Sequence, residues 1–74
     1  MTKIVVTTPF IKLDSFLKLS GAVGTGGEAK IRVKSGDVLV DGEPCTMRGK
    51  KLYPGARVKL AGEEYLVVDA SGAS

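Results

Sequence analysis

The fold class follows most directly from the stretch VLVDGE at residues 38–43. Its first three residues are apolar and two of them are β-branched, which favours a strand. Asp41-Gly42 comes next and is among the strongest two-residue hairpin signals, because both turn positions accept a positive φ. Residues 43–46 are then the return strand, with Pro44 at a sheet edge because proline has no amide hydrogen to donate. The stretch therefore predicts a β-hairpin.

The residues after this hairpin continue the β-rich pattern, with glycine and proline separating short apolar runs. We expect a basic loop at residues 48–51, a turn at 53–55, a strand at 57–60, a turn at 61–64 and a final strand at 65–68. Residues 69–74 have the composition of a frayed tail. The second half of the chain is thus predicted to form a small sheet.

The residues before the hairpin begin with a short strand at 4–6 and then show helical spacing. Apolar side chains recur on one face of residues 13–20, which predicts a helix of about two turns that ends at Gly21. Asp14 can accept hydrogen bonds from free amides near its start, and it can pair with Lys18 four residues later. Together with the hairpin, this helix indicates a small α+β domain.

The segment EAKIRVKS at residues 28–35 is ambiguous. Apolar and basic residues alternate along it, which is typical of a strand, but Ala29 and Val33 also share one helix face. In the helical interpretation Lys30 and Lys34 share a face as well. The helix would then begin after the glycine-rich connection at residues 21–27, whose free amides could bind a phosphate. The local pattern does not decide between the two.

No arrangement of residues in the chain predicts catalysis. GTGGEA at residues 24–29 matches the dinucleotide fingerprint formally, but no strand leads into it and 74 residues are too few for a doubly wound fold. Glu63 and Glu64 are adjacent, so a strand would point them to opposite faces. The chain has no histidine and one cysteine, Cys45, which is expected to be a packed or half-exposed structural residue. We therefore predict that the protein is not an enzyme and has no cofactor, metal site or small-molecule substrate.

Charge is distributed unevenly along the chain. Residues 1–59 hold eleven basic and five acidic residues, a balance of +6, whereas residues 60–74 hold three acidic residues and no basic one, a balance of −3. A one-sided positive field favours a polyanionic partner, although ordinary scattered surface lysines explain the charge equally well. Aromatic residues are few and Phe16 is expected in the core, so recognition of folded RNA by shape and backbone is favoured over stacking on single strands. We expect a cytoplasmic protein with no signal peptide and no membrane segment.

Four blocks, in order, resemble a known family: IKLDSFLK at residues 11–18, TGGEAK at 25–30, VLVDGE at 38–43 and RGKKLYPG at 48–55. They are similar to the S-four RNA-binding domain, and more closely to its small stand-alone bacterial members of the YaaA/YbcJ type. The resemblance implies an αL fold, in which two short helices pack on a small, mostly antiparallel sheet. It therefore favours the helical interpretation of residues 28–35. The expected organisation is one domain at residues 1–74, with its core at about 11–60 and flanking strands at 3–7 and 65–68.

The resemblance also implies an RNA-binding face formed by the two helices, the loop between them and the basic loop. By position, the residues expected on this face are Lys12, Lys18, Thr25, Lys30, Arg48, Lys50 and Lys51. Lys34 is added because of its helical spacing to Lys30. The expected function is non-catalytic binding of structured RNA, such as rRNA or tRNA, in association with ribosomal particles. Its affinity should depend steeply on salt, since phosphates would supply most contacts.

The chain departs from the family pattern at three positions. Gly26 stands where the wider family often has an arginine, Arg32 stands where relatives tend to be apolar, and Ala56 replaces a usual aspartate. The missing arginine supports an alternative function: a protein-interaction or regulatory module of the same fold that docks on a ribosome or RNA-processing factor without binding RNA. DNA binding ranks last, because nothing in the chain resembles a groove-reading helix.

Overall fold

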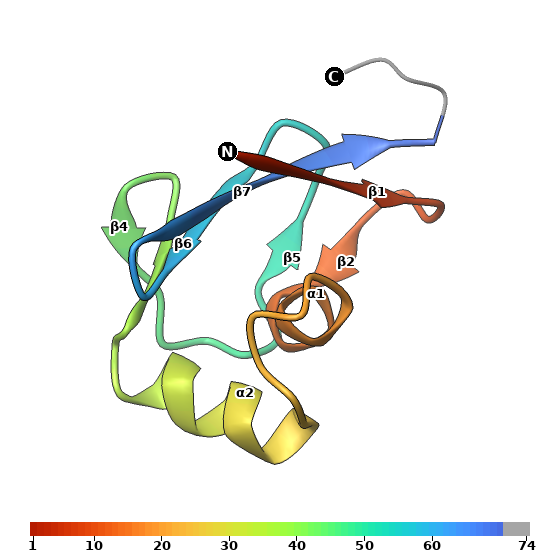
Figure 1. The fold of residues 1–74 in the computed structure, drawn as a ribbon. Coiled ribbons are helices and arrows are strands. Elements are labelled where there is room, and N and C mark those ends of the chain that lie inside the picture. Colours follow the sequence, from red (N-terminus) through yellow and green to blue (C-terminus); the bar gives the residue numbers. More distant parts are fainter. Residues whose placement is uncertain (71–74) are drawn as a thin grey trace.

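The computed structural model describes residues 1–70, which form two helices and seven strands (Figure 1). The elements are β1 (Thr2–Val6), β2 (Ile11–Lys12), α1 (Leu13–Leu19), α2 (Gly26–Lys34), β3 (Val38–Val40), β4 (Glu43–Pro44), β5 (Lys51–Leu52), β6 (Arg57–Leu60) and β7 (Glu63–Asp69). Neither helix of this part of the chain is long and apolar enough to cross a membrane. Asp69 ends β7 instead of opening a tail, and residues 71–74 lie outside the described residues.

Five of the strands form one sheet in the order β1-β7-β6-β3-β4. β1 pairs with β7 in parallel, and the other neighbours pair antiparallel. The strands at the two ends of the described chain therefore lie side by side, from Thr2 opposite Tyr65 to Val6 opposite Asp69. β2 and β5 form a separate antiparallel ladder. The predicted α+β class, with two short helices on a mostly antiparallel sheet, is confirmed.

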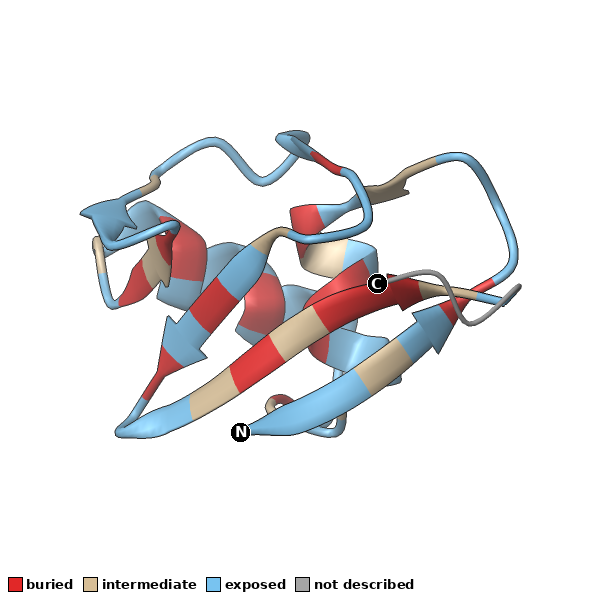
Figure 2. Cartoon of the chain, turned by 90° about the horizontal axis from the view of Figure 1, so that it is seen from above, coloured by how far each residue is buried: buried red, intermediate tan, exposed pale blue. Residues whose placement is uncertain are grey.

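The core lies between the sheet and the helices, which share one side of the sheet (Figures 1 and 2). β6 shows the alternation clearly: Val58 and Leu60 are buried, whereas Arg57 and Lys59 are exposed. Phe16 of α1 is fully buried, as predicted, and its ring meets that of Tyr65 edge to face at a centroid distance of 6.2 Å. Such an aromatic pair stabilises by about 0.5–1.5 kcal/mol beyond the area that it buries. This contact joins the first helix to the last strand.

Residues 28–35 lie almost entirely in helix α2, so the strand interpretation of their alternating pattern is wrong. Ala29 and Val33, one turn apart, are fully buried, whereas Ile31 between them is 69% exposed. Only a helix can bury two residues four apart and expose the one midway. Arg32 lies outside the core as well, with Nη1 3.5 Å from Oδ2 of Asp37. Its departure from the family pattern is therefore accommodated at the surface.

Helix α1 begins and ends as predicted, but its expected ion pair is absent from the described residues. The Asp14 carboxylate accepts the amide of Ser15 at 2.7 Å instead of pairing with Lys18. Asp14 is half-buried at the start of the helix, whereas Lys18 is exposed in its last turn. The hydrogen bond from the Ser15 amide keeps the Asp14 carboxylate at the start of the helix, where it can also interact favourably with the helix dipole.

The predicted Asp41-Gly42 turn is confirmed: Val40 pairs with Glu43, and both turn residues have a positive φ, 52° and 87°. β4 is shorter than the predicted return strand of residues 43–46, and Pro44 lies on the sheet edge as expected. A second tight turn joins β6 to β7 at Ala61-Gly62, with φ values of 55° and 82°. The predicted turn at residues 61–64 is thus two residues long, because Glu63 and Glu64 already pair in the sheet.

Ala61 occupies a backbone conformation that costs an alanine about 1–2 kcal/mol. We predict that Ala61→Gly raises the free energy of unfolding by about 0.5–1 kcal/mol, since glycine adopts this conformation without strain but loses more chain entropy. Urea denaturation monitored by circular dichroism measures the change. Ala56→Gly is the control, because Ala56 has an ordinary φ, and it should destabilise. Equal destabilisation by both changes would contradict the prediction.

Candidate nucleic-acid interface

The basic loop is attached to the start of helix α1 by backbone hydrogen bonds. The amide of Leu13 donates to the carbonyl of Lys50 at 2.9 Å, and the amide of Asp14 donates to that of Arg48 at 3.1 Å. The first amides of a helix have no partner within the helix, and the N-cap residue Lys12 supplies no side-chain bond here. The loop carbonyls therefore satisfy these amides. Their pairing fixes the loop on α1 and leaves its charged side chains exposed.

The loop spans residues 45–50, because Lys51 of the predicted basic loop belongs to β5. Cys45 opens it as a half-buried residue, as predicted for a structural cysteine, with Sγ 3.7 Å from the carbonyl oxygen of Met47. Lys50 donates its amide to the same carbonyl at 3.0 Å. These internal bonds make the loop a defined turn.

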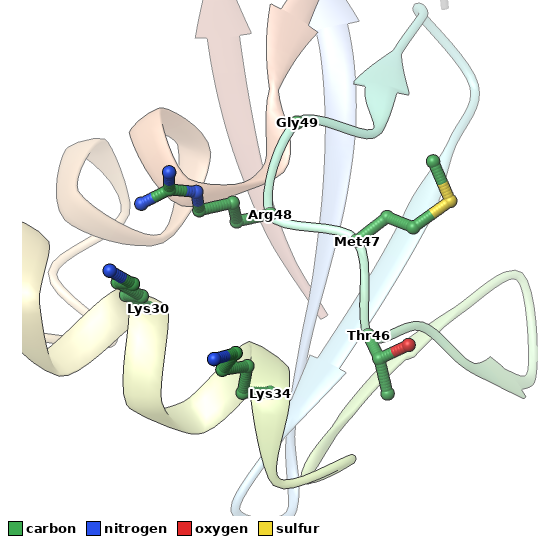
Figure 3. A pocket seen from close by; sticks show the side chains of 6 residues that line it. All are labelled: Lys30, Lys34, Thr46, Met47, Arg48 and Gly49. Atoms are coloured by element: carbon green, nitrogen blue, oxygen red, sulfur yellow. The ribbon is translucent and has the colours of Figure 1, made fainter.

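The loop and helix α2 enclose a shallow groove of about 450 Å³ (Figure 3). We call it the α2–loop groove; its lining residues are Lys30, Lys34, Thr46, Met47, Arg48 and Gly49. Lys30 and Lys34 follow one another along α2, and Arg48 extends in front of α1 in this view, whereas Met47 points the opposite way. Three of the six residues are cationic and none is acidic. This charge arrangement suits a phosphate.

The β2–β5 ladder carries a second pair of cations. Lys12 lies directly opposite Lys51, and the neighbouring pair is Ile11 with Leu52. Leu52 is buried and Ile11 is half-buried, so this pair points inward and the two lysines point outward. Like charges that are directly opposite destabilise a ladder. A bound anion would remove that repulsion.

Lys18 and Thr25 lie where the two helices meet. A Cβ built on Gly26 would lie 3.8 Å from Cδ of Lys18, so this lysine runs along the start of α2. Thr25 is the N-cap of α2, and its Oγ1 accepts the amide of Glu28 at 3.1 Å. The Glu28 carboxylate in turn accepts the amide of Gly24 at 2.9 Å. In the connection at residues 21–27, whose amides were expected to be free for phosphate, the amides of residues 21–24 are thus already bonded, and the Glu28 carboxylate stands beside them.

Lys50 does not line the α2–loop groove. It lines two further hollows, and Asp41 lines both of them; Lys51 and Tyr53 line the first of the two as well. Glu43 also lines one of these hollows. Lys50 therefore shares its surroundings with acidic residues, unlike the cations of the α2–loop groove.

The family is established by comparison with known proteins. The chain matches the family model described as the S4 domain over residues 4–68. The chain belongs to the S4 domain family.

Relatives of this S4 domain carry informative names. The probable ribosome maturation protein RlbA of Bacillus subtilis is 42% identical over 57 residues, which are 77% of this chain and 80% of the relative. The putative RNA-binding protein YbcJ of Escherichia coli is 38% identical over 60 residues, which are 81% of this chain and 86% of the relative.

The solved structure of YbcJ has the same fold. It was determined in solution, is described as revealing an αL motif involved in RNA binding, and matches with a TM-score of 0.71 at 35% identity. The match covers 92% of this chain and 87% of YbcJ. The αL fold expected from the four sequence blocks is therefore confirmed.

In this S4 domain the eight predicted face residues are all exposed, and the structure sorts them into four places. The α2–loop groove holds Lys30, Lys34 and Arg48, the ladder holds Lys12 and Lys51, the helix junction holds Lys18 and Thr25, and Lys50 lines two other hollows, one of them together with Lys51. Sequence reasoning missed Thr46, Met47 and Gly49 as groove residues. Their position directly around Arg48 in the chain was the available signal.

The role of Thr25 can be separated from RNA contact by a stability measurement. We predict that Thr25→Ala lowers the free energy of unfolding by about 1 kcal/mol, because the N-cap bond to Glu28 is lost. Thr25→Ser keeps a hydroxyl acceptor and should change stability little. Thermal unfolding of both variants checks this. Equal stability of Thr25→Ala and the unchanged protein would show that the cap is not needed.

Proposed function

We propose that this protein is a non-catalytic RNA-binding module that holds structured RNA by its phosphates. The observation that carries the proposal is the α2–loop groove, where Lys30, Lys34 and Arg48 converge without an acidic neighbour among the lining residues. Lysine and arginine side chains supply most protein contacts to nucleic-acid phosphates. The names of RlbA and YbcJ support the same function.

The RNA we propose is rRNA, with tRNA as the next candidate, in association with ribosomal particles in the cytoplasm. Support comes from the more similar of the two relatives described above, which is named as a probable ribosome maturation protein. A folded RNA also suits the site, because double-helical RNA is recognised mainly by its shape, phosphates and 2′-hydroxyls. The whole chain of residues 1–74 would act as one binding unit.

The proposed face residues have unequal roles. Lys30, Lys34 and Arg48 would contact one phosphate region, and Lys12 with Lys51 would contact another. Lys18 would add charge at the helix junction, where Thr25 holds the start of α2. Lys50 would contribute least, because Asp41 and Glu43 share its surroundings.

The first test is fluorescence anisotropy with a labelled RNA hairpin at several salt concentrations. With four to six phosphate contacts, log affinity should fall against log salt with a slope of roughly −3 to −5. The double variant Lys30→Ala/Lys34→Ala should weaken binding at every salt concentration and reduce the steepness of the slope by about two. The DNA hairpin of identical sequence should bind more weakly than the RNA.

The matched control is Lys3→Ala/Lys59→Ala, which removes the same charge from the opposite side of the sheet. Lys3 and Lys59 are exposed and alternate with residues that face the core, so they point away from the helices. This variant should keep most of the affinity and nearly the original slope. Equal losses of RNA affinity in both double variants, or an affinity that does not change with salt, would contradict the proposed site. The first outcome would show that any basic part of the surface binds RNA equally well.

Gly26 offers a gain-of-function test of the rival protein-docking hypothesis. It does not have a positive φ, and a Cβ there meets only the flexible Lys18 side chain within 4 Å, so the backbone tolerates a side chain. Gly26→Arg should strengthen RNA binding and steepen the salt slope by about one, because it adds a cation beside Lys18. Thr2→Arg, which adds the same charge on exposed β1, should change the slope less. Equal effects of the two changes would place the helix junction outside the interface.

A further inference from the structure

Two aromatic residues flank the β2–β5 ladder, one directly before β2 and one directly after β5. Ile11 lies opposite Leu52, so the next pair in the antiparallel register is Phe10 with Tyr53. Their ring centroids are 6.0 Å apart with the planes tilted by 48°, and Nζ of Lys51 lies 4.9 Å from the Phe10 ring centroid. The aromatic pair therefore lies at the end of the ladder that holds the two opposed lysines.

The four side chains share one face. Residues two apart on a strand point the same way, so Phe10 accompanies Lys12 and Tyr53 accompanies Lys51. The intervening pair, Ile11 and Leu52, points inward. We call this set of Phe10, Lys12, Lys51 and Tyr53 the ladder face.

Folding alone leaves two costs on the ladder face. Tyr53 remains 55% exposed although it could bury more apolar area, and Lys12 and Lys51 repel each other across the ladder. The contact between Phe10 and Tyr53 explains why the rings pair, and the Phe10 ring gives the Lys51 ammonium a cation–π contact, but a neutral ring does not cancel the charge of two opposed lysines. A ligand with a flat apolar ring next to a negative charge would relieve both costs, and a nucleotide has these two parts.

We propose that the ladder face is a stacking site for an unpaired RNA base, with the Tyr53 ring against the base and Lys12 and Lys51 on the flanking phosphates. This inference rests on the proposed function and specifies its RNA: a double-helical or folded element that carries an unpaired nucleotide. It also differs from the expectation, based on the small number of aromatic residues, that recognition by shape and backbone is favoured over stacking on single strands. The ladder joins two aromatic residues that are far apart in the sequence.

The ladder face and the α2–loop groove can contact the same RNA. Arg48 of the groove is three residues from Lys51, which limits their Cα separation to about 11 Å. The loop between them is held against α1 by the carbonyls of Arg48 and Lys50. The two sites are thus at a fixed, short spacing, with phosphates in the groove and a base on the ladder face.

The experiment compares two labelled RNA hairpins with the same stem, one fully paired and one with a single bulged 2-aminopurine. The unchanged protein should bind the bulged hairpin about tenfold more tightly, and the 2-aminopurine fluorescence should change on binding because its stacking changes. Tyr53→Leu should abolish this preference while keeping the affinity for the paired hairpin. Tyr53→Phe should keep the preference, because the ring remains.

Ile31→Ala is the matched control, since Ile31 is an apolar residue that is 69% exposed on α2 and lies outside the ladder face. It should leave the preference intact, and the affinity for the paired hairpin reports whether each variant is folded. Binding of both hairpins without preference, or a preference that survives in Tyr53→Leu, would overturn this inference and leave the proposed function standing. Binding of neither hairpin by the unchanged protein would overturn both.

Discussion

The hydrogen bonds from the start of helix α1 to the carbonyls of Arg48 and Lys50 are the constraint on which the site depends. They join residues more than thirty positions apart in the chain. They supply acceptors for helix amides, and they hold the basic loop in place. The helix needs acceptors for amides that have no partner in its first turn. The basic loop needs an anchor, because its residues are exposed and contribute little to the core. By pairing these groups, the backbone holds the loop beside α2 and leaves its charged side chains free. Because the backbone alone holds the loop, its charged side chains do not have to be buried to be positioned.

The cations of the α2–loop groove repel one another, and their exposure to water weakens this repulsion. Lys30, Lys34 and Arg48 lie around one groove, where mutual repulsion opposes folding, but their exposure to water keeps that repulsion small. Asp14, whose amide bonds to the Arg48 carbonyl, lies within the face. Other carboxylates of the described residues lie at its borders: Glu28 at the start of α2, and Asp41 with Glu43 beside Lys50. These carboxylates would discourage phosphates from sliding outward. The charge pattern thus defines where an RNA backbone could lie as well as attracting it.

How far the sequence predicted the fold depended on whether a feature was local. The Asp41-Gly42 turn was correct because its residues accept a positive φ whatever surrounds them. Residues 28–35 were ambiguous because two patterns overlap in them. Their alternation of apolar and basic residues is typical of a strand, whereas the spacing of Ala29 and Val33 is typical of a helix. Burial against α1 and the sheet decided in favour of the helix. Pairing of Asp14 with Lys18 failed because a nearer amide was available to the carboxylate. The resemblance to the S4 domain supplied the architecture that local patterns left open, and the comparisons confirmed it.

The sequence by itself determined the types of group that this protein contains: many lysines and arginines, no histidine, few aromatic residues and a β-hairpin beside a short helix. These properties depend on composition and on neighbours in the chain. Only the tertiary structure decided which cations share a groove, that Lys12 faces Lys51, and that Phe10 meets Tyr53 across the ladder. Those relations come from strand register and from backbone bonds between distant segments. In the β2–β5 ladder, a change of register by one residue would point the lysine of the shifted strand to the other face.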